Sequence, residues 1–246
     1  NSELGTTISE NQSLLSIRTP SGVQFNEQLQ GDIVSAGKLE VGQSLILAGN
    51  QLYIEGQLTA ERDLTLKAQD TVTIRDTATL AFSAQARRNL TIQGKQGIDI
   101  LALQNSEQRP FVSGGALSLL SDGVISADAH FDSGGALQIL TLEETPGNVV
   151  SLYDPIIFAD GNVVFGDYTG VALKIEATGS IQAGNIVITG PDTTLTADGS
   201  GSDEDLLASS RAVILRAGID SITSSTTPQV FSGTTFTSNP DSELPS

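Results

Sequence analysis

The sequence contains no cysteine, no methionine and no tryptophan, and aromatic residues make up only 4% of its 246 positions. Without cysteine the chain has no disulfide, no thiol nucleophile and no cysteine-based zinc site. The only histidine, His130, excludes a zinc site built from several histidines. It could serve as the base of a Ser–His–Asp triad, but no Gly-x-Ser-x-Gly turn supplies a nucleophile. We therefore expect a structural role for His130 and no catalytic site.

Basic side chains are also scarce: 12 lysines and arginines stand against 29 acidic residues, for a net charge of −17. Such a charge repels nucleic acid and anionic lipid. Apolar runs stay far below the roughly 18 residues of a membrane-spanning helix, so we expect no membrane span. The remaining polarity is mostly serine, threonine, asparagine and glutamine, which indicates an extracellular or outer cell-surface location. The lack of methionine predicts a mature or excised segment of a longer protein.

The sequence does contain a short repeat of three residues, in which an apolar residue is followed by any residue and then by a second apolar residue. Corresponding pairs in successive rounds lie 19 or 20 residues apart. The middle residue is often threonine, which suits the outer side of a strand. The clearest pairs are Leu39/Val41, Leu45/Leu47, Leu52/Ile54, Leu58/Ala60, Leu64/Leu66 and Val72/Ile74, and a third round is expected at Leu80/Phe82, Leu90/Ile92 and Ile98/Ile100.

Three strand-length pieces per period, each with one buried side, predict an all-β fold. The expected architecture is a three-sided parallel β-helix with roughly 20 residues per coil. An antiparallel sandwich or barrel is the competing fold, and it requires tight hairpin turns. Three dipeptides could make them: Asp122–Gly123, Asp160–Gly161 and Asp198–Gly199. The period explains more of the chain than these turns do.

The regular pattern predicts the organisation of the chain. Residues 1–36 are expected to be an irregular lead-in with incoming strands, and residues 37–222 the β-helix. Residues 223–246 are rich in serine, threonine and proline and are expected to be a tail or linker. The expected surface excursions are residues 105–112, 143–162 and 198–207.

Two groups of acidic residues are candidates for chemistry. Paired carboxylates could support a glycosidase or lyase on one face of the solenoid, although sequence distance does not fix their separation. The candidates are Asp122, Asp128 and Asp132, or Asp154 and Asp160. A weaker candidate is a calcium site, since calcium prefers oxygen ligands, and its residues would be Asp198, Asp203, Glu204 and Asp205. A solvated surface loop is the favoured interpretation of that segment.

Several phrases carry a family resemblance: residues 123–131, 151–157, 164–181 and 186–191. They are similar to filamentous haemagglutinin-like surface proteins of cyanobacteria. The resemblance implies a large secreted protein, exported by a two-partner route, that forms a right-handed β-helical fibre. The Asn-Pro-Asn-Gly type motif of the family's secretion domain does not occur here, so the chain would be a segment of fibre shaft or a relative exported otherwise.

The function expected from the sequence is a non-enzymatic, structural and adhesive segment of a cell-surface fibre. Its expected partners are cell-surface or polysaccharide contacts and further copies of itself joined end to end, and no cofactor is expected apart from the calcium candidate. The alternatives are a β-helical protein that binds or degrades polysaccharide, and a calcium-dependent ligand-binding module.

Overall fold

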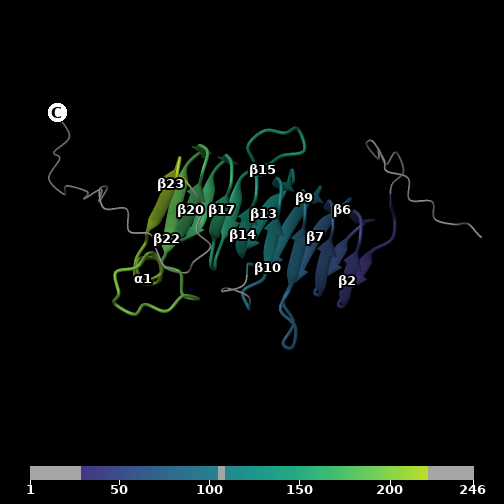
Figure 1. Ribbon diagram of the computed structural model, residues 1–246, viewed down its shortest axis with the longest axis horizontal. Helices are drawn as coiled ribbons and strands as arrows, with labels where there is room; N and C mark the ends of the chain where they lie inside the picture. The colour runs from purple at the N-terminus through teal and green to yellow at the C-terminus, as the bar shows by residue number, and fades with distance from the viewer. Residues whose placement is uncertain (1–28, 105–108, 221–246) are drawn as a thin grey trace, which may run out of the picture.

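The computed structural model describes residues 29–104 and 109–220, and it is a three-sided parallel β-helix (Figure 1). The chain passes through sheets A, B and C in turn, once per coil, and every sheet pairing is parallel. This excludes the antiparallel sandwich or barrel for the described part of the chain. One short helix, α1 (Asp203–Ser209), lies between the last two strands in sequence.

Each sheet is built from strands of successive coils. Sheet A contains β1 (Ile33–Ser35), β4 (Leu52–Ile54), β7 (Thr71–Arg75), β10 (Gly97–Leu101), β13 (Val124–Asp128), β16 (Val149–Ser151), β19 (Tyr168–Val171) and β22 (Ile186–Gly190). Sheet B contains β2 (Lys38–Val41), β5 (Gln57–Ala60), β8 (Ser83–Ala86), β11 (Phe111–Ser113), β14 (His130–Ser133), β17 (Ile156–Ala159), β20 (Leu173–Ala177) and β23 (Val213–Ala217). Sheet C contains β3 (Leu45–Gly49), β6 (Leu64–Ala68), β9 (Leu90–Gly94), β12 (Leu117–Leu120), β15 (Leu137–Leu140), β18 (Val163–Val164) and β21 (Ile181–Gln182).

The core is the interior of this prism. In β6, Leu64 and Leu66 are fully buried, whereas Thr65 between them faces outward. This alternation follows from the two-residue period of a strand. Because the register pairs Leu64 with Leu45 and with Leu90, like side chains stack along the axis. Leu45 and Leu64 are 19 residues apart and Leu52 and Val72 are 20 apart, so the predicted spacing is confirmed between the first two rounds, whereas Leu64 and Leu90 are 26 apart.

Aromatic residues form one stack inside the prism. The ring centroids of Phe82 and Phe111 lie 5.2 Å apart, and those of Phe111 and Phe131 lie 4.9 Å apart. Phe111 and Phe131 are register partners on adjacent strands of sheet B. All three rings are buried in the core.

Polar residues at the corner between sheets B and C join one coil to the next. The carboxylate of Asp63 accepts a hydrogen bond from the backbone N–H of Asn89, at 3.2 Å. The side-chain oxygen of Asn89 in turn accepts from the N–H of Ala116, at 3.0 Å. A side chain that satisfies the next coil's N–H explains why polar residues precede the apolar pairs.

The third round differs from the prediction in one place. The strand of sheet B is Ser83–Ala86, and Ala84 and not Leu80 is the register partner of Leu58. Residues 76–82 make an extra turn first, in which the N–H of Phe82 donates to Asp76 Oδ1 at 2.7 Å. The small side chains of β8 leave room for the Phe82 ring, and that ring fills the core in their place.

The first two expected excursions were too long. Residues 105–108 lie outside the described residues, and 111–112 belong to β11 rather than to a loop. Only residues 141–148 leave the prism in the second segment, because Val149–Ser151 and Ile156–Ala159 are strands of sheets A and B. Pro155 and the buried Asp154 merely turn the corner between them.

The other boundaries also moved. The third excursion spans residues 191–212, longer than the predicted 198–207, and contains α1. Ile33–Ser35 is the first described strand, so the β-helix starts inside the predicted lead-in. The rest of that lead-in, residues 1–28, and the predicted tail, 223–246, lie outside the described residues.

Candidate functional site on the outer face of sheet B

Charged side chains gather on the outer face of sheet B, in its last four strands. In register, His130 of β14 lies beside Ile156 of β17, which lies beside Lys174 of β20 and then Ile214 of β23. The neighbouring row along the axis runs through Asp132, Phe158, Glu176 and Arg216. Parallel pairing thus places residues from four coils next to each other.

Residues 191–212, here called the strap, contain α1, which packs against this face through Leu207 and Asp203. The Ser202 side chain caps α1 by accepting from the N–H of Asp205 at 3.1 Å, and three acidic residues occupy its first turn, where the helix dipole favours them. Leu207 of α1 is 1% exposed and belongs to a small apolar cluster outside the prism, with Ile156, Ala172, Ala212 and Ile214. The strap is therefore held partly by apolar burial.

Four charged side chains hold the strap to the sheet. Asp203 of α1 lies 3.0 Å from Lys174 Nζ and accepts a hydrogen bond of 2.8 Å from Arg216. Glu176 accepts a 2.7 Å bond from the same Arg216, and Lys174 Nζ lies 3.6 Å from its carboxylate. Burial alone would raise the pKa of Asp203, but the hydrogen bonds and charges of Arg216 and Lys174 outweigh it and lower that pKa. Asp203 is thus kept ionised and paired.

A second ion pair adjoins this network. Arg109 is paired with Asp132, and its guanidinium lies 4.7 Å from the centre of the Phe158 ring. Lys174 Nζ lies 5.4 Å from the same ring. Cations over an aromatic face are attracted by the ring quadrupole, and both cations near Phe158 are also paired with carboxylates.

His130 is buried at the corner between sheets A and B. Its Nε2 atom lies 2.6 Å from Asp154 Oδ1, and the two residues are 8% and 1% exposed. Asp154 adopts a left-handed backbone conformation, with a φ of 51°. Among the described residues, no hydroxyl group hydrogen-bonds to His130. The pair therefore lacks, within this part of the chain, the nucleophile that a triad requires.

The other predicted carboxylates lie in different local environments. Asp128 is buried and accepts hydrogen bonds from the Ser151 hydroxyl, at 2.7 Å, and from the N–H of Leu152. Asp122 lies at a different corner, where it accepts from the N–H of Leu142 at 2.9 Å, and Asp160 is exposed after β17. The structure brings none of these together as a pair of free carboxylates.

The predicted calcium ligands do not converge either. Asp203 faces Lys174 and Arg216, whereas Asp205 accepts from the N–H of Gly199 at 2.8 Å and Asp198 from the N–H of Ser200 at 2.9 Å. Glu204 is exposed. Across residues 29–104 and 109–220, no three histidine or carboxylate side chains are grouped so as to hold a metal ion. These residues organise the strap.

Sequence reasoning missed the residues that carry the ion network: Arg109, Phe158, Lys174, Glu176 and Arg216. A signal was present in β20, where Lys174 and Glu176 alternate with apolar residues and must face outward from a buried strand. Their partners lie on other coils and in the strap, so the network itself required the three-dimensional register.

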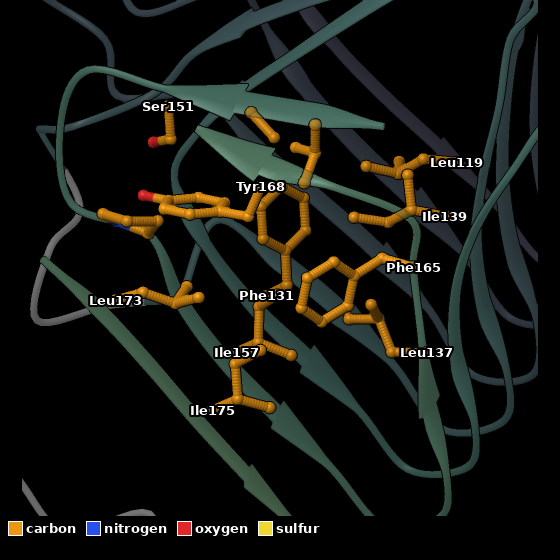
Figure 2. A pocket seen from close by; sticks show the side chains of 13 residues that line it. Leu119, Phe131, Leu137, Ile139, Ser151, Ile157, Phe165, Tyr168, Leu173 and Ile175 are labelled. Atoms are coloured by element: carbon orange, nitrogen blue, oxygen red, sulfur yellow. The ribbon is translucent and has the colours of Figure 1, made fainter. Parts of the chain in front are cut away.

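The interior also holds a cavity of about 20 Å³, just enough for one water-sized sphere (Figure 2). Its lining is apolar apart from Ser151 and Tyr168, and includes Phe131, Phe165 and Leu137. The Tyr168 hydroxyl donates to the carbonyl of Val171 at 2.7 Å, and burial raises the pKa of Tyr168. With its polar groups already bonded, the cavity is a packing defect rather than a ligand site.

Asp192, in the strap, gives a pH-dependent prediction. Burial raises its pKa above the ordinary value, and the nearby Asp154 charge adds to this. The folded protein then binds the proton more tightly than the unfolded chain, so this residue's contribution to stability falls as pH rises through the raised pKa. We expect Asp192→Asn to be more stable than the parent at pH 7, because the neutral amide removes a buried charge and its Oδ1 still accepts from Thr194. The advantage is expected to disappear in acid, where Asp192 itself becomes protonated.

Urea unfolding between about pH 3 and pH 8 measures this difference. The exposed Asp160→Asn is the matched control and is expected to follow the parent at every pH. A stability gain for Asp192→Asn that is constant across the whole range would contradict the assignment, since titration could not then be its cause.

Within the described residues, no helix is long and apolar enough to cross a membrane. Comparisons of this chain with models of protein families, with curated proteins and with solved structures give no match.

Proposed function

We propose that this chain is a non-enzymatic, structural and adhesive segment of an extracellular fibre. The observation that carries the proposal is the uninterrupted stacking of coils, since eight strands of sheet A and eight of sheet B follow one another without a break in pairing. At about 4.8 Å per strand, eight coils make a rod of about 34 Å. A shaft of this kind presents repeated side surfaces at fixed spacing.

The chemistry of the outer face of sheet B supports a structural role. Its acids and bases neutralise each other and hold the strap in place, so they leave no free acid–base pair for catalysis. The histidine that could act as a base is paired with Asp154 and buried. The ends of the solenoid also fit a shaft: among the described residues, β1 and β22 each pair on one side only, and such sheet edges are continued by further coils or covered.

The proposal is tested by displaying the folded chain on beads. Many weak side contacts add up only when copies are close together. We expect retention of the beads on cell layers and on polysaccharide films under flow to rise more steeply than in proportion to coating density. Beads that carry an unrelated acidic protein at equal density are the control. Equal retention of both bead types on every surface would overturn the proposal.

A further inference from the structure

The outer face of sheet C carries a groove that lies apart from the charged site on sheet B. It has a volume of about 600 Å³. Its floor is formed by strands β9, β12, β15, β18 and β21, and its wall by residues 141–148. The lining consists of Thr91, Ser118, Leu120, Gln138, Leu140, Glu144, Pro146, Val164 and Gln182. We call this feature the sheet C groove.

The wall of the groove is preformed. The N–H of Thr141 donates to the carbonyl of Thr145 at 2.8 Å, and the N–H of Glu144 donates to the carbonyl of Thr141 at 3.0 Å. The N–H of Gly147 then returns to the carbonyl of Ile139, at 2.9 Å. These bonds fix a tight turn that stands beside the sheet, and they place Glu144 and Pro146 against the groove.

The floor contains a row that runs parallel to the fibre axis. Thr91, Ser118, Gln138, Val164 and Gln182 are register partners on five consecutive strands. Neighbouring members are therefore separated by one strand spacing, about 4.8 Å. Within the described part of the chain, the side chains of Ser118, Gln138 and Gln182 make no hydrogen bond to protein. They offer amide and hydroxyl groups to an outside ligand, with Ser118 and Gln138 one strand spacing apart and Gln138 and Gln182 two strand spacings apart.

The chemistry of the lining selects the kind of ligand. No lysine or arginine lines the groove, Glu144 stands in its wall, and the whole chain has a net charge of −17, so a polyanion is repelled. Leu120, Leu140 and Pro146 provide apolar surface beside the polar row. A peptide strand would need a free sheet edge for backbone pairing, and here the backbone of the floor is paired within sheet C.

We propose that the sheet C groove binds an extended, uncharged polysaccharide, with the chain laid along the fibre axis. A sugar chain of this type has hydroxyl groups at its edges and C–H groups on its faces, and in extended form it repeats once per sugar at close to the strand spacing. Ser118 and Gln138 bond neighbouring sugars, Gln182 bonds a sugar two strand spacings beyond Gln138, and the apolar residues pack against a ring face. The inference rests on the proposed function, because the groove would be one of the adhesive surfaces on the side of the fibre.

The test is affinity electrophoresis of the whole chain in gels that contain one polysaccharide each, using dextran, galactomannan and hydroxyethyl cellulose as neutral probes and alginate as the anionic probe. We expect retardation by at least one neutral probe and none by alginate. The double variant Gln138→Ala/Gln182→Ala is expected to bind roughly tenfold more weakly, because two hydrogen-bonding side chains are lost. The control Gln57→Ala/Gln85→Ala removes the same groups from sheet B and is expected to bind as the parent does.

Retardation by none of the neutral probes overturns the inference, and so does equal weakening in the two double variants or retardation by alginate alone. Thermal melts of both double variants establish that they are folded, so that a loss of binding is not a loss of structure. The bead experiment separates the two proposals. Adhesion that persists in the Gln138→Ala/Gln182→Ala variant without any polysaccharide binding leaves the fibre proposal standing and removes only the groove's ligand.

Discussion

Replacing Phe111 by alanine is expected to lower the free energy of unfolding by about 3–5 kcal/mol, the usual cost of deleting a buried aromatic side chain. Phe111 is 0% exposed, and its ring lies between those of Phe82 and Phe131. The deletion removes two ring contacts at once. Because the stack spans successive coils, neighbouring side chains cannot collapse into the space without breaking the register of sheet B.

Urea unfolding followed by circular dichroism measures this loss. The control is Val124→Ala, a truncation in the same part of the chain at a position 67% exposed, and it is expected to change stability by less than about 0.5 kcal/mol. If Phe111→Ala were as stable as this control, the aromatic stack would contribute nothing to the core and the described interior would be wrong.

Replacing Arg216 by methionine is expected to weaken docking of the strap by about 2–3 kcal/mol. The change leaves Asp203 and Glu176, each with only 10% of its side chain exposed, to share the single charge of Lys174. Removing one partner of a fully buried ion pair costs about 3–5 kcal/mol, and the loss is smaller here because 22% of the Arg216 side chain is exposed. Methionine keeps much of the packing volume, so the effect reports the charge.

Hydrogen exchange of the α1 amides measures this prediction, since a strap can open without global unfolding. Exchange in residues 203–209 is expected to accelerate strongly, whereas exchange in β6 and β9 stays as in the parent. The control Arg87→Met removes an exposed pair with Glu61, whose side chains are 77% and 50% exposed, and is expected to cost about 0–1 kcal/mol. Unchanged α1 exchange in Arg216→Met would mean that the four charges do not hold the strap.

The fold was predictable because the same apolar pattern recurs in successive coils of a solenoid. The spacing of Leu45, Leu64 and Leu90 follows from the stacking of like residues along one axis. A wrong strand assignment in one coil does not prevent the pattern from being recognised in the next coil. The prediction was wrong at Leu80/Phe82, where an extra turn moves the strand to Ala84 and Ala86. The strand was missed because its buried residues, Ala84 and Ala86, are small, and the larger Phe82 nearby resembles a member of a buried pair.

The candidate site was less predictable, for a physical reason. Lys174 and Glu176 are close in sequence, but Asp203 and Arg216 reach them through the strap and through the register of two strands. The acidic segment looked like a solvated loop. Its pattern of Ser202 followed by Asp205 and two leucines is, however, a helix start with an apolar face, and could have predicted α1.

The direction of the backbone hydrogen bonds has a consequence for a chain under tension. In all three sheets these bonds point from coil to coil, parallel to the long axis of the molecule (Figure 1). A pull applied along that axis therefore loads the coils in series, and the terminal coils, which among the described residues pair on one side only, are expected to separate first. Such a molecule lengthens stepwise and dissipates work at each step, instead of snapping at a single yield force.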